Sequence, residues 1–457
     1  MQPRSICRHS ILLACVVLVG CSKKEASQNV APDPSSTATT NTAQAVPTVD
    51  SERGAMAGRW HATIALEGDG LAPTSVPFEL KISATDDEPS VVVNGDNELA
   101  ITAVSIDDHE VTMTFAAFQT KIVARLSEEK PRTLKGTWSL PWAGGSLEFP
   151  FIAAQGERAR FDVLAASSAA ISDSAIAAVP SVDGLWEVSY PQPDGSTKLC
   201  GARFAQGQGS VQEGSVQGVF VAPTGDYGHL AGVFQKGQLR LSYFDGAFAY
   251  IVTADAQPDG TLRGAGQFNL FRQEFSARHI KDTLDNALPE CAEITEWTGK
   301  GSVSSLVFTD LSGKDFALAD AGLEGKVVLL DLFGTWCPNC HELVPLLKEW
   351  HERYQAEGLV IIGVSFEFAD GQSSVSAYRD RYKIPYRLLV GAPPQDAADV
   401  LPQMSLTSFP TLVLVGRDGK IHNIQTGFRG LATGEFRAAG AALYEDQIKQ
   451  LLAKDAE

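Results

Sequence analysis

The last third of the chain alternates apolar runs of strand length with stretches of helical periodicity. Residues 327–333 (VVLLDLF) and 359–367 (LVIIGVSFE) are nearly unbroken apolar runs, which is typical of strands buried on both faces of a sheet. The segment between them carries apolar side chains at spacings of three and four residues, which predicts a helix: Leu343, Leu346, Leu347 and Trp350.

The same alternation continues to the end of the chain. Four further segments have strand or helix patterns: 306–326 (hairpin and turn), 374–382 (helix), 410–421 (hairpin) and 433–453 (amphipathic helix). Asp418 and Gly419 supply the turn of the second hairpin, because this pair suits a tight connection between strands. The order β, α, β, α, β, β, α predicts an α/β domain over residues 303–457.

The middle of the chain alternates apolar and polar residues in short runs separated by Asp, Gly, Asn and Pro. This pattern predicts antiparallel β meanders in two similar modules, residues 56–165 and 182–280. Two motifs recur at nearly the same offset: GRW (58–60) as GLW (184–186), and LKGTW (134–138) as LRGAG (262–266). We expect each module to be a small barrel or sandwich of about eight strands.

The Gly-x-Trp start of each β module resembles the first strand of lipocalin-like barrels. The resemblance implies that Arg160 and Arg278, near the end of each module, cross Trp60 and Trp186. Both tryptophans are expected in the core, and such barrels hold a small ligand, bind a partner or act as spacers. The remaining segments, 166–181 and 281–302, are predicted linkers. The predicted fold is therefore multidomain, with two β repeats before an α/β domain.

The N-terminus has the pattern of a secretory signal. Residues 1–20 combine basic side chains with an apolar run that is too short to span a bilayer. They end in LVGC, which resembles a bacterial lipobox and implies a lipid on Cys21. Ser22 resembles the residue that sorts Gram-negative lipoproteins to the outer membrane. Residues 21–55 contain no aromatic residue and predict a disordered tether to a membrane facing the periplasm.

Composition narrows the possible partners. The chain is 44% hydrophobic and 20% charged, which is ordinary for a globular protein. Its formal net charge is −18, and such an acidic surface repels phosphate backbones. We therefore expect no nucleic-acid partner.

The seven cysteines divide into groups by position. Two leave with the signal and Cys21 carries the lipid, so Cys200, Cys291, Cys337 and Cys340 remain. The compartment outside the inner membrane permits disulfides. Cys200 and Cys291 are candidates for a structural disulfide, and two buried free thiols are the alternative.

Cys337 and Cys340 form a C-x-x-C motif between a buried strand and a helix. A cysteine at a helix N-terminus faces unpaired N–H groups and the positive end of the dipole, which favour the reactive thiolate. Pro338 suits the first helical turn because it lacks an N–H group. We therefore expect Cys337 to attack a disulfide and Cys340 to resolve the mixed disulfide. Asp331 lies inside the apolar strand, where burial raises the pKa of a carboxyl.

Residues 303–457 resemble the TlpA/ResA-type thiol–disulfide oxidoreductases, a thioredoxin-like group related to AhpC/TSA proteins. The resemblance rests on four stretches: LEGKVVLLDLFGTWCPNC, LVIIGVSFE, SFPTLVLVGRDGKI and TGFRGLATGEF. It implies a thioredoxin-like fold and an enzyme with a redox-active Cys337–Cys340 disulfide, without another cofactor or a metal. The implied partners are protein disulfide substrates and an electron donor in the inner membrane or periplasm.

The resemblance also assigns further site residues. Asp331 relays a proton to or from Cys340, and Pro410 is the cis-proline of a loop that faces the dithiol. Trp336, Phe409 and Thr411 are the implied substrate-binding residues. Many members carry a glutamate three residues after the second cysteine, where this chain has Leu343. Glu342 stands one position early, about 100° around the helix, and is not expected to replace it.

Three other interpretations of the motif remain open. C-x-x-C-H is also an attachment site for c-type haem, with His341 as a ligand, whereas the thioredoxin interpretation makes His341 an exposed helical residue. A zinc site would need a second pair of ligands, which the sequence lacks. A peroxidase would need the Pro and Thr that precede one cysteine in typical peroxiredoxins, and this pattern is absent. The protein could instead be a binding or scaffold lipoprotein whose thioredoxin-like domain is vestigial.

Overall fold

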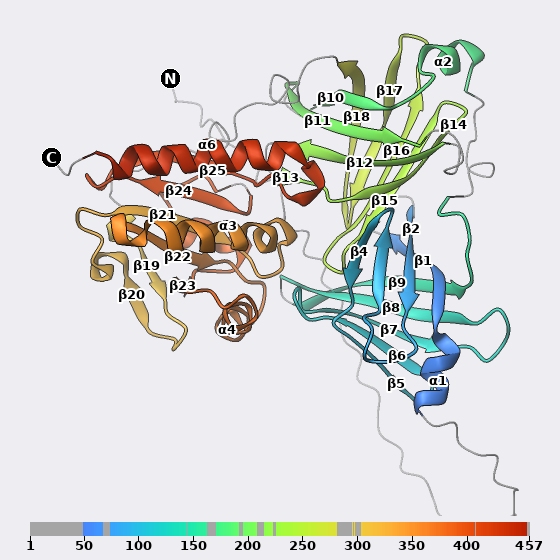
Figure 1. Cartoon of the computed structure of the whole chain (residues 1–457), viewed down its shortest axis with the longest axis horizontal. Helices are drawn as coiled ribbons and strands as arrows, with labels where there is room; N and C mark the ends of the chain where they lie inside the picture. Colours follow the sequence, from blue (N-terminus) through green and yellow to red (C-terminus); the bar gives the residue numbers. More distant parts are fainter. Residues whose placement is uncertain are drawn as a thin grey trace, which may run out of the picture.

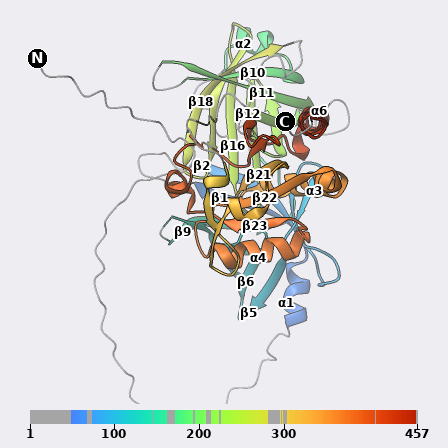
Figure 2. The ribbon, with the colours of Figure 1, turned by 90° about the vertical axis from the view of Figure 1, so that its left-hand side faces the viewer.

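A computed structural model gives the structure of the chain, and it describes these residues: 49–66, 74–143, 145–161, 171–191, 195–207, 214–222, 225–280, 295, 297, 303–406 and 408–454. They form two β modules, one above the other, and an α/β domain beside them (Figure 1). A view turned by 90° shows the α/β domain lying across the junction of the modules (Figure 2). The predicted signal 1–20, Cys21 and Cys291 lie outside the described residues.

The first module is a curved antiparallel sheet of nine strands in the order β4-β3-β2-β1-β9-β8-β7-β6-β5. Its edge strands β4 and β5 do not pair with each other, so the sheet is a half-barrel, unlike the closed form that the sequence allows. Its strands are β1 (Gly58–Leu66), β2 (Thr74–Ile82), β3 (Val91–Asn94), β4 (Asn97–Ala100), β5 (Ala103–Asp107), β6 (Glu110–Phe115), β7 (Thr120–Leu126), β8 (Thr133–Trp142) and β9 (Gly145–Gln155).

A short helix, α1 (Val49–Met56), precedes the first strand and overlaps the end of the predicted tether. Met56 is fully buried, and its carbonyl oxygen accepts a hydrogen bond from Trp60 Nε1 at 2.8 Å. Arg53 donates to the carbonyl oxygen of Val104 at 3.0 Å. These contacts attach α1 to the half-barrel, so the ordered part begins before residue 56.

The second module is a closed barrel of eight strands, because β11 pairs with both β10 and β12 and thereby joins the ends of the sheet. Helix α2 (Asp173–Ala178) precedes it inside the predicted linker and buries Ala175 against the barrel core. The strands are β10 (Gly184–Pro191), β11 (Thr197–Gln206), β12 (Ser215–Ala222), β13 (Gly225–Asp226, a short extension of the ring), β14 (Leu230–Gln235), β15 (Gln238–Phe244), β16 (Ala249–Ala256), β17 (Thr261–Phe268) and β18 (Phe271–Ile280).

The tip of the β15–β16 hairpin fills the concave face of the half-barrel. Phe244 packs against Phe78 at a ring-centroid distance of 4.4 Å and against Trp138 at 5.2 Å. Trp138 Nε1 and Thr120 Oγ1 both donate to the carbonyl oxygen of Gly246, at 3.1 and 2.5 Å. The two modules therefore share the core of the half-barrel, whereas the interior of the closed barrel is filled by a second hydrophobic cluster.

Several equivalent positions support the internal repeat. Trp186 Nε1 donates to a carbonyl oxygen four residues earlier at 2.8 Å, as Trp60 does. Gly136 and Gly264 both lie so close to a neighbouring strand that a Cβ atom would stand 2.0 or 1.9 Å from a carbonyl oxygen. Each recurring glycine is therefore required by the close approach of two strands.

The arginines do not cross these tryptophans as the lipocalin resemblance implies. Arg160 Nη2 donates to the carbonyl oxygen of Val93 at 2.6 Å, and Arg160 Nη1 donates to Ser242 Oγ at 3.2 Å. Arg278 instead forms an ion pair with Glu187 at 2.7 Å. Arg160 is thus a bridge between the two modules, because Ser242 belongs to β15.

The α/β domain is built on a seven-stranded sheet in the order β20-β19-β23-β22-β21-β24-β25, in which β21, β22 and β23 run parallel. The predicted strands and helices occur in their predicted order, but the structure adds β23 and α5, which the sequence pattern missed, between α4 and the last hairpin. The strands and helices are β19 (Val307–Thr309), β20 (Asp315–Ala317), β21 (Val327–Phe333), α3 (Pro338–Tyr354), β22 (Leu359–Ser365), α4 (Gly371–Tyr382), β23 (Arg387–Val390), α5 (Ala397–Val400), β24 (Thr411–Val415), β25 (Ile421–Thr426) and α6 (Glu435–Leu452), with short 3-10 turns between them.

Both faces of the central strand β21 are buried, as its unbroken apolar run predicts. Alternate residues of a strand point to opposite faces. Val327, Leu329 and Phe333 pack with α3, α4 and α6, whereas Leu330 and Leu332 pack with α5 on the other face. This double burial fixes the end of β21, from which the chain passes directly into the predicted dithiol motif.

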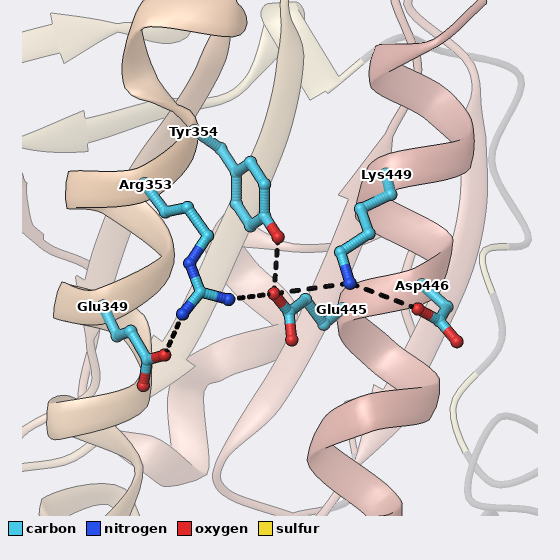
Figure 3. Close-up of polar contacts among 6 residues, drawn as sticks. All are labelled: Glu349, Arg353, Tyr354, Glu445, Asp446 and Lys449. Atoms are coloured by element: carbon cyan, nitrogen blue, oxygen red, sulfur yellow. Dashed lines mark hydrogen bonds and ion pairs between the residues drawn. The ribbon is translucent and has the colours of Figure 1, made fainter.

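Helices α3 and α6 lie side by side and are joined by stacking and by charges. The rings of Trp350 and Tyr444 stack at 5.6 Å. At the surface the Glu445 carboxylate accepts hydrogen bonds from Arg353 and from the Tyr354 hydroxyl, both at 2.5 Å (Figure 3). Exposed ion pairs contribute little on their own, so the buried stacking accounts for most of this contact. Within the described ranges, no helix is both long and apolar enough to cross a bilayer.

Candidate functional site

The dithiol lies where β21 passes into α3. Cys337 is the N-cap residue of α3, with φ −96° and ψ 112°, and Pro338 occupies the first turn as predicted. The backbone N–H of Cys340 points at Cys337 Sγ, at a distance of 3.4 Å. The sulfur of Cys337 therefore takes the place of a capping oxygen and receives one of the N–H groups that a helix leaves unpaired.

The two thiols occupy different surroundings. Cys337 is 5% exposed and donates a weak hydrogen bond to the carbonyl oxygen of Phe409 at 3.6 Å. Cys340 is 2% exposed, and burial raises the pKa of its thiol well above the ordinary value. The neighbouring Cys337 and the charge of Asp331 raise that pKa further. The Cys340 thiol is therefore harder to deprotonate than a free cysteine.

Asp331 lies in the middle of the sheet, between β22 and β24. It is 5% exposed, and burial raises the pKa of its carboxyl to about 7. Among the described residues its Oδ1 atom has no hydrogen-bond partner. A buried carboxyl oxygen without a partner is unfavourable for folding, which makes Asp331 a candidate for a chemical role. The environment matches the prediction from the apolar strand.

The predicted proline loop faces the dithiol. The peptide bond between Phe409 and Pro410 is cis, and the Phe409 ring meets Trp336 edge-on at 5.6 Å. Trp336 Nε1 donates to the carbonyl oxygen of Phe366 at 2.8 Å. Thr411 departs from the prediction, because it is fully buried and its hydroxyl donates to a carbonyl oxygen within its own loop. The Thr411 hydroxyl is therefore engaged within its own loop.

His341 is not the exposed helical residue that the thioredoxin interpretation predicts. It is 8% exposed, and its Nε2 atom lies 2.6 Å from the carbonyl oxygen of Thr335. Its Nδ1 atom lies 2.7 Å from the Tyr382 hydroxyl. Burial lowers the pKa of the imidazole to about 4. Both ring nitrogens are thus engaged inside the domain, which disfavours the haem interpretation, where His341 would bind iron.

Glu367 is a site residue that the sequence pattern does not reveal. It follows β22, is 5% exposed and accepts two hydrogen bonds from Thr335, from the backbone N–H at 2.8 Å and from the hydroxyl at 2.7 Å. Thr335 stands two residues before Cys337, so Glu367 holds the approach to the dithiol. The only signal in the sequence was the position of Glu367 directly after an apolar run. This signal is weak, because many strands are followed by a charged residue.

Glu342 does not replace the missing family glutamate. Its Oε2 atom accepts a hydrogen bond from the backbone N–H of Leu431 at 2.5 Å. Burial and the charge of Asp226 raise the pKa of Glu342 to about 7. The side chain therefore points toward the β-barrel, in agreement with its predicted position around the helix.

The remaining predicted residues lie away from the dithiol. Cys200 is a buried free thiol in the barrel, whereas its predicted disulfide partner Cys291 lies outside the described residues. A cavity of about 960 Å³ opens between the modules and not inside either of them. It is lined by nearly equal numbers of acidic and basic side chains, among them Arg59, His61, Glu79 and Arg160.

Comparison with known proteins relates the C-terminal domain to redox proteins. Residues 300–424 match the AhpC/TSA family. The chain is 28% identical over 123 residues to the "Thiol-disulfide oxidoreductase ResA" of Halalkalibacterium halodurans, a match that covers 27% of this chain and 65% of the relative. It is 30% identical over 118 residues to the "Thioredoxin-like protein YneN" of Bacillus subtilis, covering 26% of this chain and 65% of the relative.

A solved structure also matches about a third of the chain. A "putative Thiol:disulfide interchange protein DsbE from Chlorobium tepidum" is 23% identical, with a TM-score of 0.26, and covers 33% of this chain and 96% of its own. The chain spans 65% of the length of the two curated relatives named above. From its fold, site and sequence relatives, the C-terminal part is an AhpC/TSA thioredoxin-like domain related to the ResA-type thiol–disulfide oxidoreductases.

Proposed function

We propose that the chain is an envelope thiol–disulfide oxidoreductase that reduces disulfides of other proteins through Cys337 and Cys340. The observation that carries the proposal is the position of Cys337 at the start of α3, where the N–H of Cys340 reaches its sulfur at 3.4 Å. Burial raises the pKa of the Cys340 thiol, so Cys340 suits the resolving role and the better-placed Cys337 the attacking role. The name of the ResA relatives, thiol-disulfide oxidoreductase, supports the same chemistry.

The reaction proceeds in two exchange steps. In the first step the Cys337 thiolate attacks one sulfur of the substrate disulfide, the S–S bond breaks, and the other sulfur leaves and takes up a proton. In the second step Cys340 gives its proton to the Asp331 carboxylate and attacks the sulfur of Cys337. The mixed disulfide breaks, the second substrate thiol leaves, and Cys337 and Cys340 end as a disulfide after giving up two electrons.

Each cycle leaves the protein oxidised, so a second thiol partner has to return it to the dithiol. In the envelope this partner is an electron donor of the inner membrane or periplasm. The lipid on Cys21 and the tether before the half-barrel hold the protein at the outer membrane, facing the periplasm. Incorporation of labelled fatty acid, lost on Cys21→Ser, tests the anchor without reference to the redox activity.

The redox function is tested by the reduction of insulin with dithiothreitol as donor. We expect Cys337→Ala to abolish the acceleration, and Cys200→Ala, which removes a thiol in the barrel, to preserve it. Unchanged turnover in Cys337→Ala would show that the dithiol is not the catalyst. The alternative would then be a binding or scaffold lipoprotein with a vestigial thioredoxin-like domain.

A further inference from the structure

The β-barrel contacts the dithiol motif itself. Asn339 stands between the two cysteines, and its Nδ2 atom donates to the carbonyl oxygen of Asp226 at 3.3 Å. Gly225 lies so close that a Cβ atom on it would be 2.3 Å from Asn339 Nδ2 and 3.2 Å from the carbonyl oxygen of Phe428. The short strand β13 (Gly225–Asp226) thus lies directly against the first turn of α3.

The half-barrel contacts one residue before the dithiol and one residue after it in the chain. Gln119 Nε2 donates to Thr335 Oγ1 at 3.2 Å. The Phe118 ring meets His341 edge-on at 4.9 Å.

A third contact of the half-barrel involves aromatic rings. Trp142 stacks on Phe368 at 5.1 Å, and Phe368 lies 5.0 Å from Trp336. Trp336 is one of the side chains predicted to meet a substrate. The two modules together therefore approach the dithiol from both ends of its loop.

The barrel contact is held in place by a pair of carboxyl groups. The consecutive backbone N–H groups of Gly430 and Leu431 donate to Asp226 Oδ2 at 2.6 Å and to Glu342 Oε2 at 2.5 Å. A Cβ atom on Gly430 would touch both carboxyls, at 2.8 and 2.0 Å, so the two groups are neighbours. Asp226 therefore links the barrel to a loop of the thioredoxin-like domain and to Asn339 at the same time.

We propose that these contacts restrict the substrate. The side chains and short strand that the modules place around the dithiol form a collar, which consists of Phe118, Gln119, Trp142, Gly225 and Asp226. The collar admits an unhindered disulfide, carried by a small molecule or by an extended chain segment, and excludes a disulfide enclosed in a folded protein. This proposal rests on the proposed function and names the class of disulfide that reaches Cys337.

The physical basis is the geometry of attack. A thiolate must approach a disulfide along the S–S axis, so the atoms on both sides of the bond need space in front of Cys337. The space around Cys337 is already occupied: Trp336 contacts Phe368, and Asn339 contacts Asp226. Cys337 itself is only 5% exposed. A bulky partner would have to break the Asp226 contacts before its sulfur reached Cys337.

The test compares two maleimides on the reduced full-length chain: N-ethylmaleimide and a maleimide that carries a long polyethylene glycol chain. Peptide mapping by mass spectrometry gives the rate at Cys337 for each. We divide the modification rate of the large reagent by that of the small one. We expect this rate ratio at Cys337 to be at least about tenfold lower than for a cysteine peptide, which corresponds to about 1.4 kcal/mol needed to open the collar. Asp226→Ala and Trp142→Ala should raise the ratio.

Asp226→Asn keeps an oxygen that can accept from Gly430 and serves as the matched control, so its ratio should stay low. Circular dichroism establishes that each variant is folded, and Gln119→Ala provides a second opening variant should Asp226→Ala unfold. If the rate ratio at Cys337 equalled that of the cysteine peptide and did not change in any variant, the collar proposal would be wrong.

Glutathione disulfide separates the two proposals. Its reduction by the dithiol, with slow reduction of a folded disulfide protein that Asp226→Ala accelerates, supports both. A low maleimide ratio without any reaction with glutathione disulfide would refute the redox function and leave the collar standing. Equal rates with both disulfides in the unaltered chain would refute the collar alone.

Discussion

Thr335 and Glu367 are joined by two hydrogen bonds, one from the backbone N–H and one from the hydroxyl of Thr335, at 2.8 and 2.7 Å. The same threonine offers its carbonyl oxygen to His341 and its hydroxyl oxygen to Gln119. One residue thus connects the strand end, helix α3 and the half-barrel. Because Thr335 lies two residues before Cys337, these hydrogen bonds help to fix the orientation of the Cys337 side chain.

We expect Glu367→Ala to lower the free energy of unfolding by about 2 kcal/mol, because two buried donors of Thr335 lose their acceptor. The rate of insulin reduction should fall as well, since the approach to Cys337 loses its support. Denaturant unfolding and turnover assays measure the two effects. Glu352→Ala, at an exposed position of α3, is the control and should change neither quantity.

Asp331→Asn is expected to change the pH dependence of stability. The pKa of Asp331 is about 7 in the folded chain and 3.8 ordinarily, so the folded state retains a proton that the unfolded state has released. Stability therefore falls as the pH rises from about 4 to 7, by about 1.4 kcal/mol per unit for this one group. The variant should be relatively more stable at pH 7 and should lack this part of the slope.

Denaturant unfolding at a series of pH values measures the difference between Asp331→Asn and the unaltered chain. Asp320→Asn, at an exposed position, should leave the slope intact. The variant should also slow the release of the mixed disulfide, because Cys340 loses the base that takes its proton. An identical pH slope in Asp331→Asn would contradict the assignment of a buried carboxyl whose pKa is raised to about 7.

Cys340→Ala is expected to trap the first intermediate. Cys337 can still attack a disulfide, but nothing resolves the resulting mixed disulfide. Mass spectrometry after incubation with glutathione disulfide should show one glutathione on Cys337. The reverse variant, Cys337→Ala, should acquire none at Cys340, which is 2% exposed. Labelling of Cys340 in that variant would mean that the roles of the two thiols are exchanged.

Phe244→Ala is expected to destabilise the half-barrel, although Phe244 belongs to the barrel. Removal of a buried phenylalanine ring destabilises a protein by about 3–5 kcal/mol. Because Phe244 fills the core that both modules share, tryptophan fluorescence from Trp138 should report unfolding at lower denaturant. Leu199→Ala, at a side chain that is 36% exposed, should shift the midpoint little. An unchanged Trp138 environment in Phe244→Ala would refute the shared core.

Local patterns were sufficient to predict the thioredoxin-like domain. Its main features are each determined by a few neighbouring residues: the strand at 327–333, the helix start at Pro338 and the Phe409-Pro410 pair. The surroundings of Cys340 follow from the same neighbours. By contrast, the burial of Thr411 did not follow from local pattern: all five residues of β24 are buried, because the strand lies between β21 and β25 in the sheet.

Contacts between distant segments could not be derived from local pattern. Nothing near Asp226 indicates that its carbonyl oxygen meets Asn339, more than a hundred residues later. The burial of His341 depends on Tyr382 and on a residue of the half-barrel, and neither is its neighbour in sequence. Likewise, the alternating runs of the two modules are equally compatible with open and closed sheets, and only the pairing of β11 with β12 distinguishes them.

The hairpin tip that occupies the half-barrel has a consequence for biosynthesis. The half-barrel is translated first, yet Phe244, Ala249 and Ile251 of its core come from strands made later. The core of the N-terminal module therefore stays incomplete, with its aromatic side chains exposed, until the β15–β16 hairpin has been synthesised. Transfer of the half-barrel alone into another protein would leave its core without Phe244, Ala249 and Ile251.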